Sequence, residues 1–380
     1  MKTVCEKDLC AGCMACVEVC PKRAITIKDE LRHYNAVIGD SCIDCGACHR
    51  VCQKNHPAES VEPQQWYQGW ANDKNIRMDG SSGGLAMALA RGFVQNGGLV
   101  CSCVFVDGKF SFKFADTADT LKEFAGSKYV KSNPLGIYKK VKEELKKDEK
   151  ILFIGLPCQV SALRNFVGDK LYNGLYTIDL ICHGTPSPKV LETFLQQHGY
   201  KLNELKDVSF RSKGIFRVMG DYKSIAAQGT SDSYMISFLG ALTYTDNCYS
   251  CQYAKLQRVS DLTLGDSWGS TLPRDEWEKG ISLVLCQTDK GKALLEHSDL
   301  HLEKVDLNNA VARNHQLSYP SIKPEKWNVF FDGIRKGKNF NLLVFQAFPK
   351  KCLKQMIKRI FIALKIIRGG GGITYRIEIK

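Results

Sequence analysis

The chain has 380 residues, of which 44% are hydrophobic and 24% are charged. This length predicts two or three domains, and this balance excludes disorder, collagen and a coiled coil as the main description. More than half of the net charge of +13 comes from seven basic residues in the range 350–368, so the remainder does not indicate nucleic-acid binding. Seventeen cysteines without an N-terminal secretion signal predict metal ligands or redox groups in a reducing cytoplasm.

Two cysteine-rich repeats open the chain. Residues 10–20 and 42–52 both read C-x2-C-x2-C-x3-C. In such a pair each [4Fe–4S] cluster takes three thiolates from one tight loop and the fourth from the other repeat. The sequence therefore predicts two clusters, one held by Cys10, Cys13, Cys16 and Cys52 and the other by Cys42, Cys45, Cys48 and Cys20. A zinc module and unrelated surface cysteines are the alternatives, and two matching runs of four cysteines disfavour both.

The segment between the repeats is predicted to form a hairpin from strands at 24–28 and 34–38. With it, residues 1–58 resemble the bacterial two-cluster ferredoxin domain. Gln53 replaces the second proline of that pattern, which leaves the ligands intact. Cys5 lies outside the pattern, and packing is its expected role.

Alternating helix and strand patterns after residue 57 predict an α/β or α+β body. Pro63 marks a linker, and a Ser-Ser-Gly-Gly turn at 81–84 precedes a helix. Asn133 and Ser187 have the chemistry of helix N-caps. We predict helices at 85–95, 133–147, 159–166 and 187–197, and strands at 100–106, 151–154, 175–181, 261–264 and 281–286.

A second set of four cysteines lies in this body. Cys158 begins a helix directly after a strand, where the helix dipole favours a thiolate. Cys182 ends the next strand, and Cys248 and Cys251 form a C-x2-C loop. Ligands of open α/β sheets bind beyond the carboxyl ends of strands, so the four cysteines are candidates for a third cluster. A redox-active or zinc-binding C-x2-C and simple core cysteines are the alternatives.

Several motifs over residues 66–319 together resemble the family of coenzyme F420 hydrogenase/dehydrogenase beta subunits. They are the segments 81–84, 126–132, 153–159, 182–184, 248–251 and 265–269. The resemblance implies an iron–sulfur flavoprotein that carries FAD, or FMN, beside a third [4Fe–4S] cluster. It assigns that cluster to Cys158, Cys182, Cys248 and Cys251, and the flavin to Ser82, Gly83, Gly84, Lys128 and Tyr129.

The flavin residues also have a direct physical interpretation. A turn that opens a helix offers amides and hydroxyls to a phosphate, although the same residues make an ordinary helix start. Lys128 and Lys131 are candidates for neutralising the pyrophosphate or the reduced flavin, and two solvated lysines are the alternative. His183 is either a proton relay or a structural histidine. No catalytic residue is assigned.

The C-terminal residues 350–368 are predicted to form a basic amphipathic helix, followed by a glycine tail at 369–372. Its apolar side is expected either to meet an anionic membrane or a partner, or to pack on its own body. The predicted domains are therefore 1–58, the family's flavin-binding part at 64–148, the part with the third cluster at 149–322, and this extension at 323–380.

These observations predict an α+β protein: a 2[4Fe–4S] ferredoxin-type domain followed by an α/β flavin- and cluster-binding body. The expected function is a cytoplasmic oxidoreductase that moves electrons between a two-electron carrier, such as reduced coenzyme F420, and a ferredoxin or other redox partner protein. The alternative is a non-catalytic electron-transfer subunit that feeds a partner reductase, for example in polysaccharide biosynthesis. A DNA-binding iron–sulfur regulator is disfavoured, because the sequence contains no recognisable DNA-binding element.

Overall fold

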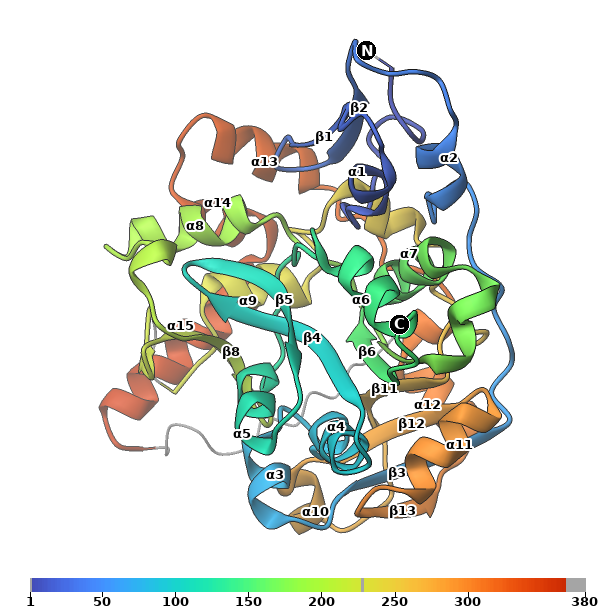
Figure 1. The fold of residues 1–380 in the computed structure, drawn as a ribbon. Helices are drawn as coiled ribbons and strands as arrows, with labels where there is room; N and C mark the ends of the chain where they lie inside the picture. Colours follow the sequence, from blue (N-terminus) through green and yellow to red (C-terminus); the bar gives the residue numbers. More distant parts are fainter. Residues whose placement is uncertain (1, 227–228, 367–380) are drawn as a thin grey trace.

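The computed structural model describes residues 2–226 and 229–366. At the N-terminus, helices α1 (Ala15–Val19) and α2 (Ala47–Val51) follow the two cysteine loops, one in each repeat. Strands β1 (Ile25–Asp29) and β2 (Tyr34–Ile38) pair antiparallel between them. The predicted hairpin is confirmed, and this part lies at one end of the molecule (Figure 1).

The body is built on one eight-stranded sheet with the order β13-β3-β12-β11-β7-β6-β4-β5. The four strands β11, β7, β6 and β4 run parallel, and antiparallel strands complete both edges. Strands from the predicted segments 64–148 and 149–322 therefore share this sheet. The strands are β3 (Gln65–Ala71), β4 (Leu99–Val106), β5 (Lys109–Ala115), β6 (Ile151–Gly155), β7 (Leu175–Leu180), β11 (Leu262–Asp266), β12 (Ser282–Cys286) and β13 (Leu300–Lys304).

Both faces of this sheet are covered by helices. In β6, Leu152 and Ile154 pack into a core that includes residues of α4 (Leu85–Gln95) and α11 (Asp289–Glu296). Ile151 and Phe153 point the other way, toward α6 (Ile137–Leu145) and α7 (Pro157–Val167). Burial on both faces explains why β6 is apolar at every position, as parallel strands generally are.

A second, three-stranded sheet with the order β10-β9-β8 packs with helices from the C-terminal half. Its strands are β8 (Val208–Ser212), β9 (Ile215–Gly220) and β10 (Lys223–Ser224). The helices of this core are α8 (Pro188–Gln197), α9 (Ser233–Leu239), α13 (Trp327–Arg335) and α14 (Phe340–Ala347). The sequence analysis predicted α8, with its Ser187 cap, but it missed this sheet and the edge-side strands β3, β5 and β13.

Helix boundaries agree with the predictions to within a few residues. The structure places α4 at the predicted residues, whereas α6 begins at Ile137 rather than at Asn133. The amide of Asn133 donates to the Phe110 carbonyl, so this residue bridges to the sheet before the helix starts. The remaining helices are α3 (Lys74–Asp79), α5 (Ala118–Leu121), α10 (Arg274–Lys279), α12 (Leu307–Arg313) and α15 (Pro349–Ala363).

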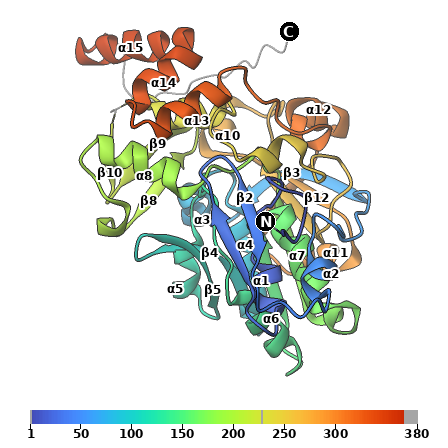
Figure 2. The same ribbon diagram turned by 90° about the horizontal axis from the view of Figure 1, so that it is seen from above.

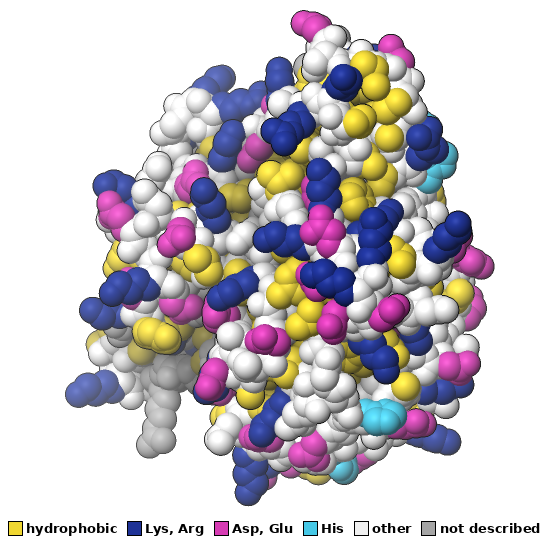
Figure 3. Space-filling view, viewed as in Figure 1, with side chains coloured by type: hydrophobic (Ala, Val, Ile, Leu, Met, Phe, Trp, Pro, Cys, Tyr) yellow, Lys and Arg dark blue, Asp and Glu magenta, His cyan; other side chains and the backbone are white. Residues whose placement is uncertain are grey.

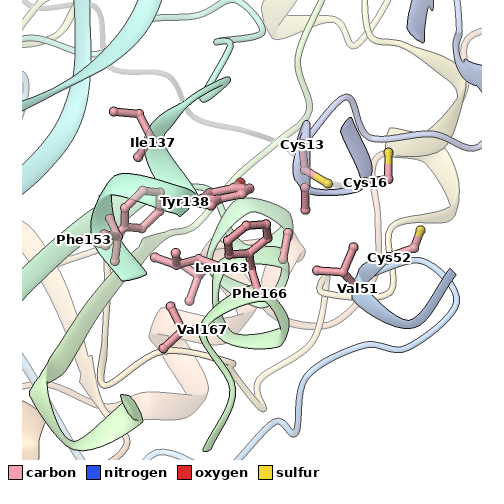
Figure 4. Close-up of a cluster of buried hydrophobic side chains, with 14 of the residues drawn as sticks. Cys13, Cys16, Val51, Cys52, Ile137, Tyr138, Phe153, Leu163, Phe166 and Val167 are labelled. Carbon is pink, nitrogen blue, oxygen red and sulfur yellow. The ribbon is translucent and has the colours of Figure 1, made fainter. Parts of the chain in front are cut away.

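The ferredoxin-type segment packs closely against the body. Its helices and cysteine loops share one hydrophobic core with α6, α7 and β6. In Figure 4, Val51 points toward Phe166 across this boundary, with Cys13 and Cys16 on the ferredoxin side. Seen from above, β1 and β2 lie over the body rather than beside it (Figure 2). The cysteine loops are therefore held at a fixed place above the carboxyl ends of the central strands.

Candidate iron–sulfur and flavin site

The two cysteine loops have the same backbone course. The first loop has positive φ at Gly12 and Met14, with values of 70° and 64°. The second has positive φ at Asp44 and Gly46, the equivalent positions of the repeat, with values of 50° and 70°. Such alternation turns successive amide groups toward the inside of a loop, where they meet anionic groups. The duplication predicted from cysteine spacing is thus also a duplication of loop conformation.

The first loop forms a buried site. A single cavity is lined by four of the predicted ligands, Cys10, Cys13, Cys16 and Cys52. The Gly12 amide donates to Cys10 Sγ over 3.4 Å. Cys5 also lines this cavity and is buried, so the cysteine that the sequence analysis assigned to packing lies beside the predicted ligands.

The second site lies at the surface. Cys45 is exposed, while Cys20, Cys42 and Cys48 are half-buried. The Ala24 amide donates to Cys20 Sγ over 3.3 Å, and the Asp44 amide donates to Cys42 Sγ over 3.4 Å. Hydrophobic side chains gather over the upper part of the molecule in Figure 3. A cluster held here would be open to a partner.

The donor sets fit iron–sulfur clusters. All donors are thiols, and amides already point at several sulfurs, which is the arrangement that stabilises cluster sulfur charge. Burial raises the pKa of the Cys13 and Cys16 thiols well above the usual range. A compensating positive charge is therefore needed to keep these buried sulfurs as thiolates, and iron ions supply it.

The body cysteines meet in a second large cavity. Cys158 is the second residue of α7, Cys182 follows β7, and Cys248 and Cys251 come from one loop. All four line the same cavity beyond the carboxyl ends of the parallel strands. The sequence prediction that these residues share one site rested on that rule for open sheets. Burial also raises the pKa of the Cys158, Cys182 and Cys251 thiols, as at the first site.

The loop with Cys248 and Cys251 is held by polar contacts. The Thr185 amide donates to Cys248 Sγ over 3.4 Å, which is the same kind of sulfur contact as in the ferredoxin loops. The Arg258 guanidinium donates to the Tyr253 carbonyl over 2.6 Å and pairs with Asp179 over 3.0 Å. Arg258 and Asp179 are both almost fully buried. This ion pair fastens the loop to the end of β7.

The third site faces the first ferredoxin site. Leu9, Ala11, Gln53 and Lys54 of the ferredoxin-type segment line its cavity together with the four cysteines. Lys131 also lines it, and its Nζ donates to the Ala11 carbonyl over 3.1 Å. The sequence analysis considered Lys131 for the flavin. The structure places it between the first and third cysteine sites, because the segment after Tyr129 runs beneath the first cysteine loop.

The predicted flavin segments are neighbours, although their polar groups have protein partners. The Ser127 amide donates to Ser81 Oγ over 2.9 Å, so the 81–84 turn meets the 126–132 segment. The Gly83 amide donates to Ser282 Oγ over 2.9 Å, and Ser82 Oγ donates to the Ile281 carbonyl. Gly84 has a φ of 79° and is the N-cap of α4. A phosphate at this turn would have to replace the Ser282 contact.

Lys128 and Tyr129 lie against a buried aromatic and charged group. Lys128 Nζ donates to the Phe124 and Ala125 carbonyls over 2.9 and 2.7 Å, and burial lowers its pKa. Tyr129 stacks on Phe238 with ring centroids 4.6 Å apart. Arg211, which the sequence analysis missed, forms two hydrogen bonds to Asp266, of 2.6 and 2.8 Å. Arg211 belongs to none of the motifs found in the sequence, so the sequence alone did not indicate a role for it.

His183 is a half-buried, neutral side chain. The Gln316 amide donates to His183 Nδ1 over 2.8 Å, and burial lowers the pKa of His183 to about 4. His183 lines the cavity beside Cys182. At neutral pH it therefore accepts a hydrogen bond from Gln316 without carrying a charge.

Fold and cysteine geometry define a protein with a ferredoxin-type domain docked on an α/β body. Residues 9–58 match the family described as "4Fe-4S dicluster domain". Residues 148–308 match the family of the C-terminal part of the coenzyme F420 hydrogenase/dehydrogenase beta subunit. The family resemblance found in the sequence is thus confirmed, and the dicluster match supports the iron–sulfur clusters.

Two similar proteins come from Methanosarcina mazei and Methanocaldococcus jannaschii. A subunit of the F420H2 dehydrogenase of Methanosarcina mazei is 23% identical over 307 residues, which are 74% of this chain and 84% of that protein. A coenzyme F420-dependent sulfite reductase of Methanocaldococcus jannaschii is 26% identical over 351 residues. These residues are 86% of this chain and 51% of the sulfite reductase, so the chain spans about half of that enzyme.

Among solved structures, a chain of the F420-reducing [NiFe] hydrogenase complex from Methanosarcina barkeri matches with a TM-score of 0.47 and 18% identity. The match covers 70% of this chain and 97% of that chain.

Proposed function

We propose that this chain is an iron–sulfur flavoprotein oxidoreductase that moves electrons between a two-electron carrier, such as reduced coenzyme F420, and [4Fe–4S] clusters. One observation carries the proposal: four cysteines from three separate segments line a cavity that the ferredoxin-type segment also lines. A cluster at Cys158, Cys182, Cys248 and Cys251 would then be adjacent to one at Cys10, Cys13, Cys16 and Cys52.

The position of the first site gives the relay an order. Its four cysteines are buried, whereas those of the third site are half-buried and Cys45 of the second site is exposed. Besides burial, the neighbouring Cys13 thiol raises the pKa of Cys158, and the neighbouring Cys48 thiol raises that of Cys16, so the first site lies between the other two. Electrons would pass from the third site through the first to the second, or the reverse, and a redox partner protein would dock at the exposed second site.

Flavin belongs to the proposal through the family resemblance. A bound FAD or FMN would convert two-electron transfers into single-electron transfers, which clusters alone do not do. Ser82, Gly83, Gly84, Lys128 and Tyr129 remain its proposed neighbours. Of the two roles considered for His183, its lowered pKa and its hydrogen bond from Gln316 favour the structural one, and the Arg211–Asp266 pair lies beside Tyr129.

A second candidate is a non-catalytic electron-transfer subunit whose partner carries the substrate chemistry. The internal hydrogen bonds of Gly83 and Lys128 favour it, because they occupy the groups proposed for the flavin phosphate. Turnover separates the two candidates. The oxidoreductase is supported if anaerobically purified, reconstituted protein oxidises reduced coenzyme F420 without a partner. The electron-transfer role is supported if the protein has full clusters but no flavin and no turnover.

Replacing Cys158 tests the third site directly. Cys158→Ser is expected to lose about four iron atoms per chain and to retain the dicluster pair, because one ligand of the third cluster is removed. Iron and sulfide assays with electron paramagnetic resonance spectra measure this loss. Cys103→Ser is the matched control, since Cys103 is a half-buried cysteine on β4 outside the three sites. Equal iron in Cys158→Ser and the wild type would contradict the proposed third cluster.

A further inference from the structure

Helix α15 packs on the body through Cys352 and two polar side chains, Gln355 and Arg359. Gln355 is its most buried residue, at 8% exposure, and its Oε1 accepts a hydrogen bond from the Ser231 amide over 3.3 Å. Arg359, one turn further, donates from Nε to Thr230 Oγ1 over 3.0 Å. Residues four apart lie on one face of a helix, so these two contacts define the inner face of α15.

The opposite face of α15 is apolar and exposed. Its large side chains follow one another at intervals of three and four residues, which places them in one stripe. Each is between 42% and 62% exposed. The stripe consists of Leu353, Met356, Ile357, Ile360, Phe361 and Leu364.

This orientation reverses the usual one. A surface helix normally turns its apolar stripe to the core and its polar side to water. The alternative considered from sequence, that the apolar side packs on its own body, therefore does not hold for the described residues of α15. Ile367, Arg368 and the glycines at 369–372 lie outside the described residues. A contiguous apolar stripe left at the surface marks an interaction site.

The charges beside the stripe select its partner. Residues 350–366 contain six basic residues and no acidic one. They are Lys350, Lys351, Lys354, Lys358, Arg359 and Lys365. A second copy of the chain would bring the same positive charge, and like charges oppose that contact. An apolar stripe with a basic border matches the acyl boundary and anionic headgroups of a lipid bilayer.

We propose that α15 docks this protein onto the surface of an anionic membrane, with the stripe in the headgroup region. The helix lies at the outer edge of the molecule in two views, where a flat surface has access to it (Figures 1 and 2). No helix in residues 2–226 or 229–366 is long and apolar enough to cross a membrane. The contact would therefore be peripheral, parallel to the surface.

Vesicle co-sedimentation of the full-length holoprotein tests the proposal. The probes are vesicles of equal parts phosphatidylglycerol and phosphatidylcholine, and vesicles of phosphatidylcholine alone. The wild type is expected to bind the anionic vesicles at least tenfold more tightly. Ile357→Glu with Phe361→Glu, and separately Lys354→Gln with Lys358→Gln, should each weaken that binding about tenfold or more.

Val106→Glu is the matched control, because Val106 is also exposed, at 40%, but lies at the end of β4. It should bind anionic vesicles like the wild type. The proposal is overturned if the wild type binds neither kind of vesicle. It is also overturned if the stripe variant binds anionic vesicles as tightly as the wild type. If the wild type binds no vesicles but forms a dimer, and the stripe variant is a monomer, the proposal is overturned in favour of self-association. Unchanged iron content in the variants shows that they are folded.

Discussion

Lys131 is the residue that connects the first and third cysteine sites. It is buried, with 7% exposure, and it lies over the Tyr34 ring of the ferredoxin-type segment. Burial raises the pKa of the Cys158 thiol and a hydrogen bond with Cys5 lowers that of Cys10, and at both thiols the charge of Lys131 acts to favour the thiolate. A cation that stabilises thiolates also stabilises a reduced cluster, because reduction adds negative charge.

We predict that Lys131→Met lowers the reduction potentials of clusters at these two sites by tens of millivolts, on the order expected for removal of one nearby buried charge. Redox titration followed by electron paramagnetic resonance measures the shift. Lys140→Met, which removes an exposed lysine of α6, serves as the control and should leave the potentials in place. Identical potentials in Lys131→Met and the wild type would show that this lysine only fills space.

At the scale of elements, Asp232 joins strand β9 to helix α9. Its Oδ1 accepts from the Met235 amide over 2.9 Å, as an N-cap, and its Oδ2 accepts from the Val218 amide over 2.5 Å. Burial raises the pKa of Asp232 to about 6, from an ordinary value of 3.8. The folded state thus holds this proton more tightly than the unfolded state.

The stability from this proton is fully present below about pH 4 and is lost as the pH rises through about 6. Asp232→Ser keeps a cap acceptor but does not titrate. We predict that the wild-type advantage in unfolding free energy over Asp232→Ser shrinks by roughly 2 kcal/mol between pH 4 and pH 7. Urea unfolding under argon at each pH measures it. A difference that stays constant with pH would contradict the raised pKa.

At the scale of the whole molecule, the ferredoxin-type segment is docked through both apolar and polar contacts. Besides the shared core of Figure 4, Glu18 accepts hydrogen bonds from the amides of Gly136 and Lys139 over 2.8 and 2.9 Å. These amides belong to the first turn of α6 and its N-cap, where a negative charge is favoured. This contact fixes the first cysteine loop over the body.

We expect Glu18→Ala to loosen this docking by about 1–3 kcal/mol, since it leaves two amides without acceptors. Cleavage by a glutamate-specific protease at Glu59 and Glu62, which lie in the connection to the body, should become about tenfold faster. Glu6→Ala, at an exposed glutamate of the same segment, is the control. Equal cleavage rates in the two variants would show that the apolar core alone holds the segment.

Much of this arrangement could be predicted from local pattern. Cysteine spacing identified the two loops, and apolar runs identified β6 and β7, because ligand geometry and burial act over a few neighbouring residues. Strand β3 was missed although it lies between β12 and β13. Its partners are about two hundred residues away in the chain, and such pairing leaves little trace in a single segment.

The sequence by itself determined the repeated cysteine spacing of the ferredoxin-type segment, the strand-to-helix position of Cys158 and the basic amphipathic character of the C-terminal helix. Only the tertiary structure decided what these features face. It placed Lys131 between two cysteine sites, paired Arg211 with Asp266, and turned the apolar stripe of α15 outward. Periodicity fixes which side chains share a face, but the direction of that face depends on contacts between distant segments, such as Gln355 with Ser231.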